Sequence, residues 1–162
     1  LQALLGEGDP YKTPEGMLRV LRPGLAEGIL RGGCLAILSA AVGTPYALRS
    51  DGEGSLLFVE DVDEAPYRIA RMLFQLRAAG VFRGVRGIVF GEMKGCEAGS
   101  EAGYTLDEVI DEALLGLDIP VAIGLPSGHT SGACVSLPLG VRARLWCKGR
   151  KASFEIQEAA VE

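Results

Sequence analysis

Short apolar runs, each bounded by charged or turn-forming residues, recur along this chain. The segments LLFVE (56–60), VRGIVFG (85–91) and PVAIG (120–124) are almost continuously apolar, which is typical of strands that are buried on both faces of a sheet. Two longer segments repeat their apolar residues every three or four positions, as amphipathic helices do. Buried strands that alternate with helices predict an α/β domain.

The first helical segment, YRIARMLFQLRAAG (67–80), places its arginines outside the apolar stripe. Gly80 suits the end of this helix, because glycine readily adopts the left-handed conformation that terminates many helices. The second segment, TLDEVIDEALLGL, begins at Thr105 and has Glu108 three residues later. This spacing is a capping-box signature, and it predicts that a helix starts at Thr105.

The two ends of the chain favour antiparallel strands. Residues 17–30 are interrupted by Arg22-Pro23-Gly24, which predicts two short strands joined by a turn. Residues 141–147 and 151–157 alternate with period two around a Lys-Gly-Arg turn, which predicts a closing hairpin. Hairpins at both ends would make the sheet mixed.

Glycines mark the remaining segments. Gly32 and Gly33 are expected to open a short buried helix, CLAILSAAVG, that ends at Gly43. Residues 1 to about 15 contain Gly6, Gly8 and Pro10 and show no apolar period, so we expect a loose lead-in.

The composition fits one domain that spans residues 1–162. Of these residues 48% are hydrophobic and 23% are charged, which is enough apolar material for a sizeable core. The net charge of −5, without a long basic run, argues against nucleic acid or an anionic membrane as a partner. No stretch approaches the roughly 20 apolar residues that cross a bilayer. The first residues lack the features of a signal peptide, and an opening on Leu suggests a piece of a longer chain.

The cysteines are Cys34, Cys96, Cys134 and Cys147. They form no CxxC pair, and the chain has a single histidine, so neither a zinc site nor another metal or cofactor is expected. A disulfide framework is not expected in a chain with this much core material. Reduced thiols favour a cytoplasmic protein.

His129 is the only histidine, and it follows the predicted strand 120–124 in the Gly- and Ser-rich run GLPSGH. Glu60 ends the run LLFVE, so both residues lie at the carboxyl ends of strands, where ligands of α/β sheets gather. An acid that abuts a buried strand needs a partner or a function. The pair therefore predicts the orienting acid and the base of a hydrolytic triad. A surface-loop histidine without a role is the alternative.

Glu60 also opens an acidic cluster with Asp61, Asp63 and Glu64. A solvated turn is one interpretation, and Asp63 and Glu64 would suit the N-terminus of the next helix, where the helix dipole favours negative charge. Metal binding is the weaker interpretation, because the cluster lacks the spacing of an EF-hand.

A nucleophile for this pair is missing from the sequence. No GxSxG elbow occurs, and Ser127 and Ser131 lie too near His129 along the chain. Cys34 is the internal candidate, since a helix N-terminus can lower the pKa of a thiol, although a buried structural cysteine is the more common case.

Several runs together resemble one known family. They are GGCLAILSAAVGTPY, LLFVEDVDEAPYRIARMLFQLRAAGVF, VRGIVFGEM, IPVAIGLPSGH and LPLGVRARL, in this order. From about residue 24 to residue 145 the chain resembles the C-terminal domain of the LD-carboxypeptidase family of serine peptidases, which includes microcin-immunity peptidases.

The resemblance implies a swivelling β/β/α domain that supplies a Glu and a His to a Ser-His-Glu triad. Glu60 in LLFVED matches the family's carboxylate, and His129 in GLPSGH matches its base. The serine would lie on an N-terminal domain upstream of Leu1. The implied reaction releases D-alanine from murein tetrapeptides in cell-wall recycling, and a homodimer is implied as well. The chain by itself would be inactive, since the nucleophile is missing.

Two positions depart from the family pattern. Cys34 stands where the family usually has Asn, and Ala70 where it usually has Asp. Neither change affects Glu60 or His129, but both bear on the substrate. Three alternatives remain open: an immunity-type peptidase that cleaves peptidyl or aminoacyl nucleotides, a non-catalytic interaction module, and a thiol hydrolase that uses Cys34.

Overall fold

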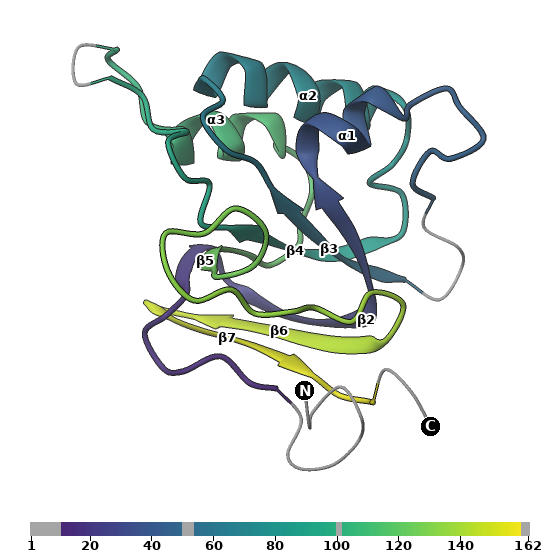
Figure 1. The fold of residues 1–162 in the computed structure, drawn as a ribbon, viewed down its shortest axis with the longest axis vertical. Helices are drawn as coiled ribbons and strands as arrows, with labels where there is room; N and C mark the ends of the chain where they lie inside the picture. Colours follow the sequence, from purple (N-terminus) through teal and green to yellow (C-terminus); the bar gives the residue numbers. More distant parts are fainter. Residues whose placement is uncertain (1–10, 50–53, 100–101, 160–162) are drawn as a thin grey trace.

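The computed structural model describes residues 11–49, 54–99 and 102–159. Within them, the chain forms one seven-stranded sheet in the order β1-β5-β4-β3-β2-β6-β7, and three helices pack on one face of it (Figure 1). The strands are β1 (Arg19–Arg22), β2 (Gly24–Cys34), β3 (Ser55–Glu60), β4 (Val85–Gly91), β5 (Val121–Leu125), β6 (Arg142–Lys148) and β7 (Lys151–Ile156). The helices are α1 (Leu35–Ala40), α2 (Pro66–Ala78) and α3 (Leu106–Ala113).

The sheet is parallel at its centre and antiparallel at its margins. Strands β2, β3, β4 and β5 run parallel to one another. Strand β1 is antiparallel to β5, and the hairpin β6–β7 adds antiparallel to β2. The predicted α/β class with a mixed sheet is therefore confirmed, as is the closing hairpin.

The sheet curls until its two ends approach each other, since Leu18 and Ala152 form an isolated antiparallel bridge. One apolar core fills the inside of this curl, and a second lies between the sheet and the helices. Strand β3 belongs to both. Its residues Leu56 and Phe58 lie in the inner core, whereas Leu57 and Val59 face the helices.

The predicted N-terminal hairpin is wrong. Residues 17–30 do contain two strands separated by Pro23, but β1 and β2 do not pair: β1 joins β5, and β2 lies between β3 and β6. Arg22 helps to hold β1 there, because its guanidinium donates to the carbonyl oxygens of Leu114 and Leu117 at 2.8 and 2.9 Å. It thereby satisfies backbone acceptors beyond the last turn of α3.

The expected loose lead-in is wrong for residues 11–13, whereas residues 14 and 15 are exposed and lie outside any helix or strand. Residues 11–13 run along β7: Thr13 N–H donates to the Phe154 carbonyl at 2.9 Å, and Phe154 N–H donates to the Thr13 hydroxyl at 2.9 Å. Thr13 is only 4% exposed. The remainder of that prediction, residues 1–10, lies outside the described residues.

Gly32 and Gly33 belong to β2 and do not open α1, which begins at Leu35. The predicted helix exists but is shorter than expected. Gly32 is required for strand packing, because a Cβ at this position would lie 1.8 Å from the carbonyl oxygen of Phe58 on β3. The residue thus permits a close approach between the two strands.

Helix α2 ends and α3 begins where the sequence predicts, but α3 stops at Ala113, short of the predicted segment's end at Leu117. In α3, the Thr105 hydroxyl accepts from Glu108 N–H and the Glu108 carboxylate accepts from Thr105 N–H, which completes the capping box. Helix α2 ends before Gly80, whose φ is +77°. Gly80 N–H donates to Arg77 and Val81 N–H to Leu76, the bonding pattern of a Schellman motif. In the described part of the chain, no helix is long and apolar enough to span a bilayer.

Candidate active site

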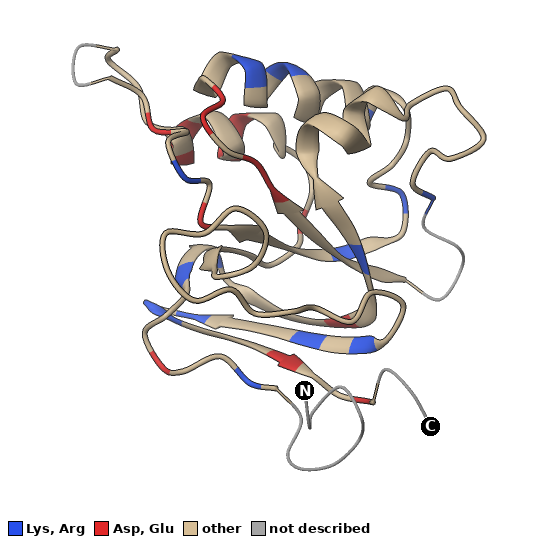
Figure 2. Cartoon of the chain, in the orientation of Figure 1, with Lys and Arg blue, Asp and Glu red and all other residues tan. Residues whose placement is uncertain are grey.

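Glu60 is the last residue of β3 and is 5% exposed. Figure 2 shows the acidic segment that starts at the end of this strand and continues toward α2. The solvated-turn interpretation fails for its first two members, because Asp61 is 4% exposed as well. Buried carboxylates need donors, and the structure supplies them to each of these two residues separately.

His129 lies in the loop that follows β5, and its side chain is 56% exposed. Its Nδ1 atom lies 2.9 Å from Glu60 Oε2, and its backbone N–H donates to the same oxygen at 3.0 Å. The structure thus brings together the two residues that the sequence singled out, although they are 69 positions apart.

The contact involves one of the two ring nitrogens, whose donor and acceptor roles depend on the tautomer. In the tautomer with its hydrogen on Nδ1, the ring donates to Glu60 Oε2, the same oxygen that accepts the backbone N–H. In that tautomer Nε2 is the acceptor nitrogen of the ring. A carboxylate that fixes the tautomer while the other nitrogen remains free to take a proton is the arrangement of the acid and base in hydrolytic triads.

Two glycines make room for the Glu60 side chain. At Gly128, which has φ +80°, a Cβ would lie 2.4 Å from Glu60 Cδ. At Gly91, the last residue of β4, a Cβ would lie 2.7 Å from Glu60 Cβ. Any larger residue at either position would displace the carboxylate or the loop. Sequence reasoning missed this requirement, although the glycine before His129 was visible in GLPSGH.

Asp61 joins the strand ends to the first helix. Its Oδ2 accepts from Ala36 N–H at 3.0 Å, and its Oδ1 accepts from Val62 N–H at 2.9 Å. The Ala36 group is one of the first-turn donors of α1 that lack a partner within the helix, so Asp61 caps this helix from the position directly after β3. Sequence reasoning assigned Asp61 no such role.

The other two acids of the cluster have separate partners. Asp63, with φ +55°, donates its backbone N–H to the Lys94 carbonyl at 2.8 Å. Glu64 lies 3.5 Å from the Arg68 guanidinium, one helical turn later. The expected position of both at the N-terminus of α2 is only approximate, because that helix starts at Pro66 without an acid in its first turn. Among the described residues, no group of three His, Cys, Asp or Glu side chains is arranged to hold a metal ion.

Glu92 is a further acid that sequence reasoning missed. It follows β4 directly, and its Oε2 accepts from Ser131 N–H at 2.8 Å, two residues beyond His129. The signal was available, since Glu92 abuts a buried apolar run just as Glu60 does.

The four cysteines are free thiols in different surroundings. Burial raises the pKa of the Cys147 thiol to about 11, and burial also raises the pKa of Cys96. Cys34 is half-buried before the first turn of α1 and is the register partner of Glu60 between β2 and β3. Cys134 is exposed in the His129 loop.

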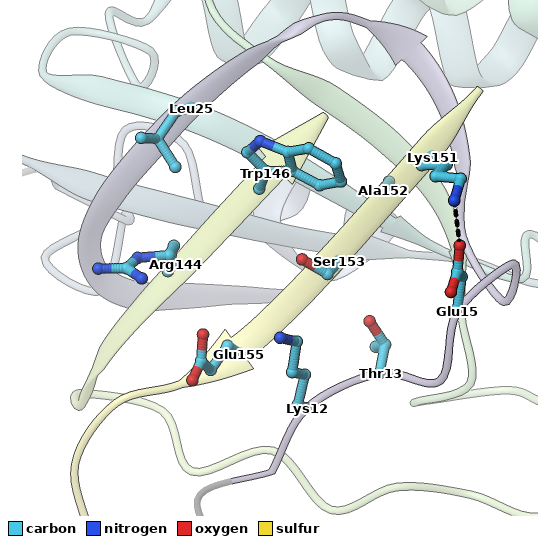
Figure 3. A pocket seen from close by; sticks show the side chains of 10 residues that line it. All are labelled: Lys12, Thr13, Glu15, Leu25, Arg144, Trp146, Lys151, Ala152, Ser153 and Glu155. Carbon is cyan, nitrogen blue, oxygen red and sulfur yellow. Dashed lines mark ion pairs between the residues drawn. The ribbon is translucent and has the colours of Figure 1, made fainter. Parts of the chain in front are cut away.

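A groove of about 590 Å³ lies elsewhere, on the outer face of the β6–β7 hairpin (Figure 3). Its lining includes Trp146, the only tryptophan. Two of its lining residues, Glu15 and Lys151, form an ion pair with each other, and a third, Arg144, pairs with Glu27. Glu60 and His129 are not among the residues that line it. The groove is therefore separate from the candidate active site.

Known proteins match this chain in sequence and in fold. The family model described as LD-carboxypeptidase C-terminal domain matches residues 27–145. A probable murein peptide carboxypeptidase of Bacillus subtilis is 34% identical over 155 residues, which cover 94% of this chain and 48% of the relative. The microcin C7 self-immunity protein of Escherichia coli is 30% identical over 141 residues, which cover 86% of this chain and 40% of the relative.

The crystal structure of muramoyltetrapeptide carboxypeptidase from Oxalobacter formigenes has the same fold, with a TM-score of 0.79 and 32% sequence identity. That similarity covers 98% of this chain and 53% of the solved chain. The chain thus spans about half the length of the relatives that it matches. The matched family model covers most of the sequence and includes both Glu60 and His129, and the chain accordingly belongs to the LD-carboxypeptidase family, whose C-terminal domain it matches.

Proposed function

We propose that this chain supplies the base and the orienting acid of a serine LD-carboxypeptidase. His129 acts as the base, Glu60 holds and stabilises its ring, and a serine carried by another part of the complete protein is the nucleophile. The observation that carries the proposal is the double hydrogen bond from His129 to Glu60 Oε2, at 2.9 Å from Nδ1 and 3.0 Å from the backbone nitrogen.

The substrate in this proposal is a murein tetrapeptide, and the bond cleaved joins an L-configured centre to a terminal D-alanine. The carboxypeptidase names of the relatives in Bacillus and Oxalobacter support this substrate class. Murein recycling in the cytoplasm is the setting that we propose.

The reaction proceeds in two stages. The serine oxygen attacks the scissile carbonyl while its proton passes to Nε2 of His129, and Glu60 stabilises the imidazolium that forms. The same proton then goes to the leaving amine, so that D-alanine departs and an acyl-enzyme ester remains. A water molecule, deprotonated by Nε2, hydrolyses the ester and regenerates the serine. Donors for the oxyanion come from the rest of the complete protein in this scheme.

The test measures D-alanine release from a murein tetrapeptide. We expect release by the complete protein, and no release by the 162-residue chain alone or by the complete protein with His129→Ala. Lys151→Ala, on the distant hairpin, serves as the matched surface control and should retain wild-type activity. Full activity of His129→Ala would contradict the assignment of the base and favour a binding or scaffolding role for the domain.

An immunity-type peptidase is the second candidate, because the chain is 30% identical to the microcin C7 self-immunity protein over 141 residues. A structure of that protein in complex with glutamyl sulfamoyl guanosine matches this chain with a TM-score of 0.72 at 28% identity. The same Glu60–His129 pair would serve an aminoacyl-nucleotide substrate. Assaying the complete protein on both substrate classes distinguishes the two candidates by their kcat/KM values.

A further inference from the structure

Glu92 is a carboxylate beside the candidate active site that the proposed reaction does not use. It lies at the end of β4, next to Gly91, the residue that packs against Glu60. Its Oε2 accepts the backbone N–H of Ser131 at 2.8 Å, and the two residues are 39 positions apart in the sequence. A half-buried acid with a backbone donor from a distant loop differs from a solvated surface acid, whose partner is water.

The loop that receives this bond is the one that carries His129. Val135 N–H donates to the Pro126 carbonyl at 2.7 Å, which closes the base of the loop. Within the closed segment, Thr130 bonds only within the loop itself, from its hydroxyl to the Gly132 carbonyl at 3.1 Å. The segment around His129 is mostly exposed, so burial contributes little to holding its shape.

Two carboxylates of the sheet therefore hold this loop from neighbouring strands. Glu60, on β3, binds the loop at His129, and Glu92, after β4, binds it two residues later at Ser131. Without Glu92, the loop would be held only at its base and at His129, whereas a further bond to the neighbouring strand restricts its direction beyond His129. Because Nε2 of His129 must meet a nucleophile that lies outside this chain in the proposed reaction, the direction of the ring matters as much as its tautomer.

We propose that Glu92 is a positioning residue for His129, acting by anchoring the His129 loop to β4 through the Ser131 N–H. The role in catalysis rests on the proposed function, whereas the anchoring itself can be tested without substrate. The acceptor oxygen is the operative group. Glu92→Gln keeps an oxygen that can accept from Ser131, and Glu92→Ala removes it.

The first arm of the test is NMR on the 162-residue chain. His129 is the only histidine, so its ring resonances are assigned without ambiguity. Ser131 is exposed, and the protection of its amide against hydrogen exchange reports the bond to Glu92. We expect Glu92→Ala to accelerate exchange at Ser131 by about fivefold, the factor of one typical hydrogen bond, and to broaden the His129 ring signals. Glu92→Gln should restore both.

The second arm measures D-alanine release by the complete protein. Glu92→Ala should lower kcat by about tenfold or more with KM unchanged, since misplacement of a catalytic group costs rate rather than binding. Glu92→Gln should stay within about twofold of the wild type. Glu97→Ala removes an exposed carboxylate from the same segment after β4 and is the matched control.

Either of two results would overturn the proposal. Unchanged Ser131 exchange in Glu92→Ala would show that the bond does not anchor the loop. Equal losses in Glu92→Gln and Glu92→Ala would show that the negative charge matters and the anchor does not. Failure of the proposed function would look different, because the wild-type complete protein would then release no D-alanine while the NMR result stood.

Discussion

Glutamate side chains have different partners in two regions of the molecule: the carboxyl edge of the parallel strands and the outer face formed by β2, β6 and β7. At the edge, Glu60 is 5% exposed and binds N–H groups of a single loop. On the outer face, Glu27 pairs with Arg144 at 2.6 Å with its side chain 40% exposed. Glu15 pairs with Lys151 at 2.5 Å with its side chain 74% exposed.

The partners explain the difference in role. Backbone donors are fixed by the fold, so a buried carboxylate that binds them determines where a loop lies. Arginine and lysine side chains are long and mobile, and exposed pairs of this kind contribute little to stability. A carboxylate at a strand end therefore indicates a positioned loop when its partner is a backbone N–H group. The size of a groove does not point to this edge, since the 590 Å³ groove lies on the outer face.

Glu60→Gln should produce the largest effect. In the complete protein, we expect kcat for D-alanine release to fall by about 10³- to 10⁴-fold, as it does when the acid of a Ser-His-Asp triad becomes an amide. The physical reason is the loss of the charge that stabilises the imidazolium and fixes its tautomer. Glu27→Gln makes the identical chemical change on the outer face and should leave kcat unaltered. Similar losses in both variants would remove the distinction between the two regions.

Gly128→Ala should come next, with an effect on stability as well as on activity. Its Cβ would lie 2.4 Å from Glu60 Cδ, in a residue with φ +80°. Gly43→Ala is the matched control, because Gly43 has φ +84° and a Cβ there would meet no atom within 4 Å.

Urea unfolding of the two glycine variants separates backbone strain from the clash. Each should lose about 1 to 2 kcal/mol for the left-handed conformation, and Gly128→Ala a further 1 kcal/mol or more for overpacking. Only Gly128→Ala should shift the His129 ring resonances. Equal losses in the two variants, with unchanged resonances, would mean that the space around Glu60 is not restricted.

Removing the ion pair of Glu27 should have the smallest effect, a small loss of folding stability that depends on pH. The hydrogen bond from Arg144 lowers the pKa of Glu27 below its ordinary value of 4.5. The folded state therefore binds this proton less readily than the unfolded chain, so the pair's stabilisation is present above pH 4.5 and is lost as pH falls through the folded pKa.

Urea midpoints of the wild type and Glu27→Gln test this expectation. The small difference between them at neutral pH should shrink at pH 3 and in high salt. If the difference between the two urea midpoints grew on acidification, the direction assigned to the pKa shift of Glu27 would be wrong.

Local patterns in the sequence predicted the elements that depend on local interactions. The apolar runs predicted β3, β4 and β5, and the capping box at Thr105 predicted where α3 begins. Glu60 and His129 could be selected as a pair because both follow buried strands, and the parallel order β3-β4-β5 brings their strand ends to one edge. Their catalytic roles remain predictions.

Non-local pairing is what the sequence patterns could not provide. Arg22-Pro23-Gly24 has the composition of a hairpin turn, yet β1 pairs with β5, about 100 residues away in the chain. Gly32 was assigned to the start of a helix because the sequence does not show that Phe58 approaches it. The partner of Glu92 is Ser131, in the loop after β5, and the sequence does not show that this loop lies against the end of β4. Each of these misses depends on a contact between segments that are distant in the sequence.

Strand β3, which ends in Glu60, contributes residues to both apolar cores, and this affects how the protein unfolds. Opening the helix layer would expose Leu57 and Val59, and opening the inside of the curl would expose Leu56 and Phe58. Neither compartment can therefore melt without weakening the other, and β3 should disappear only in a cooperative transition of the whole domain. The acid is thereby placed in the part of the molecule that partial unfolding reaches last, whereas the exposed loop that carries the histidine depends on its bonds to Glu60 and Glu92 to keep its place.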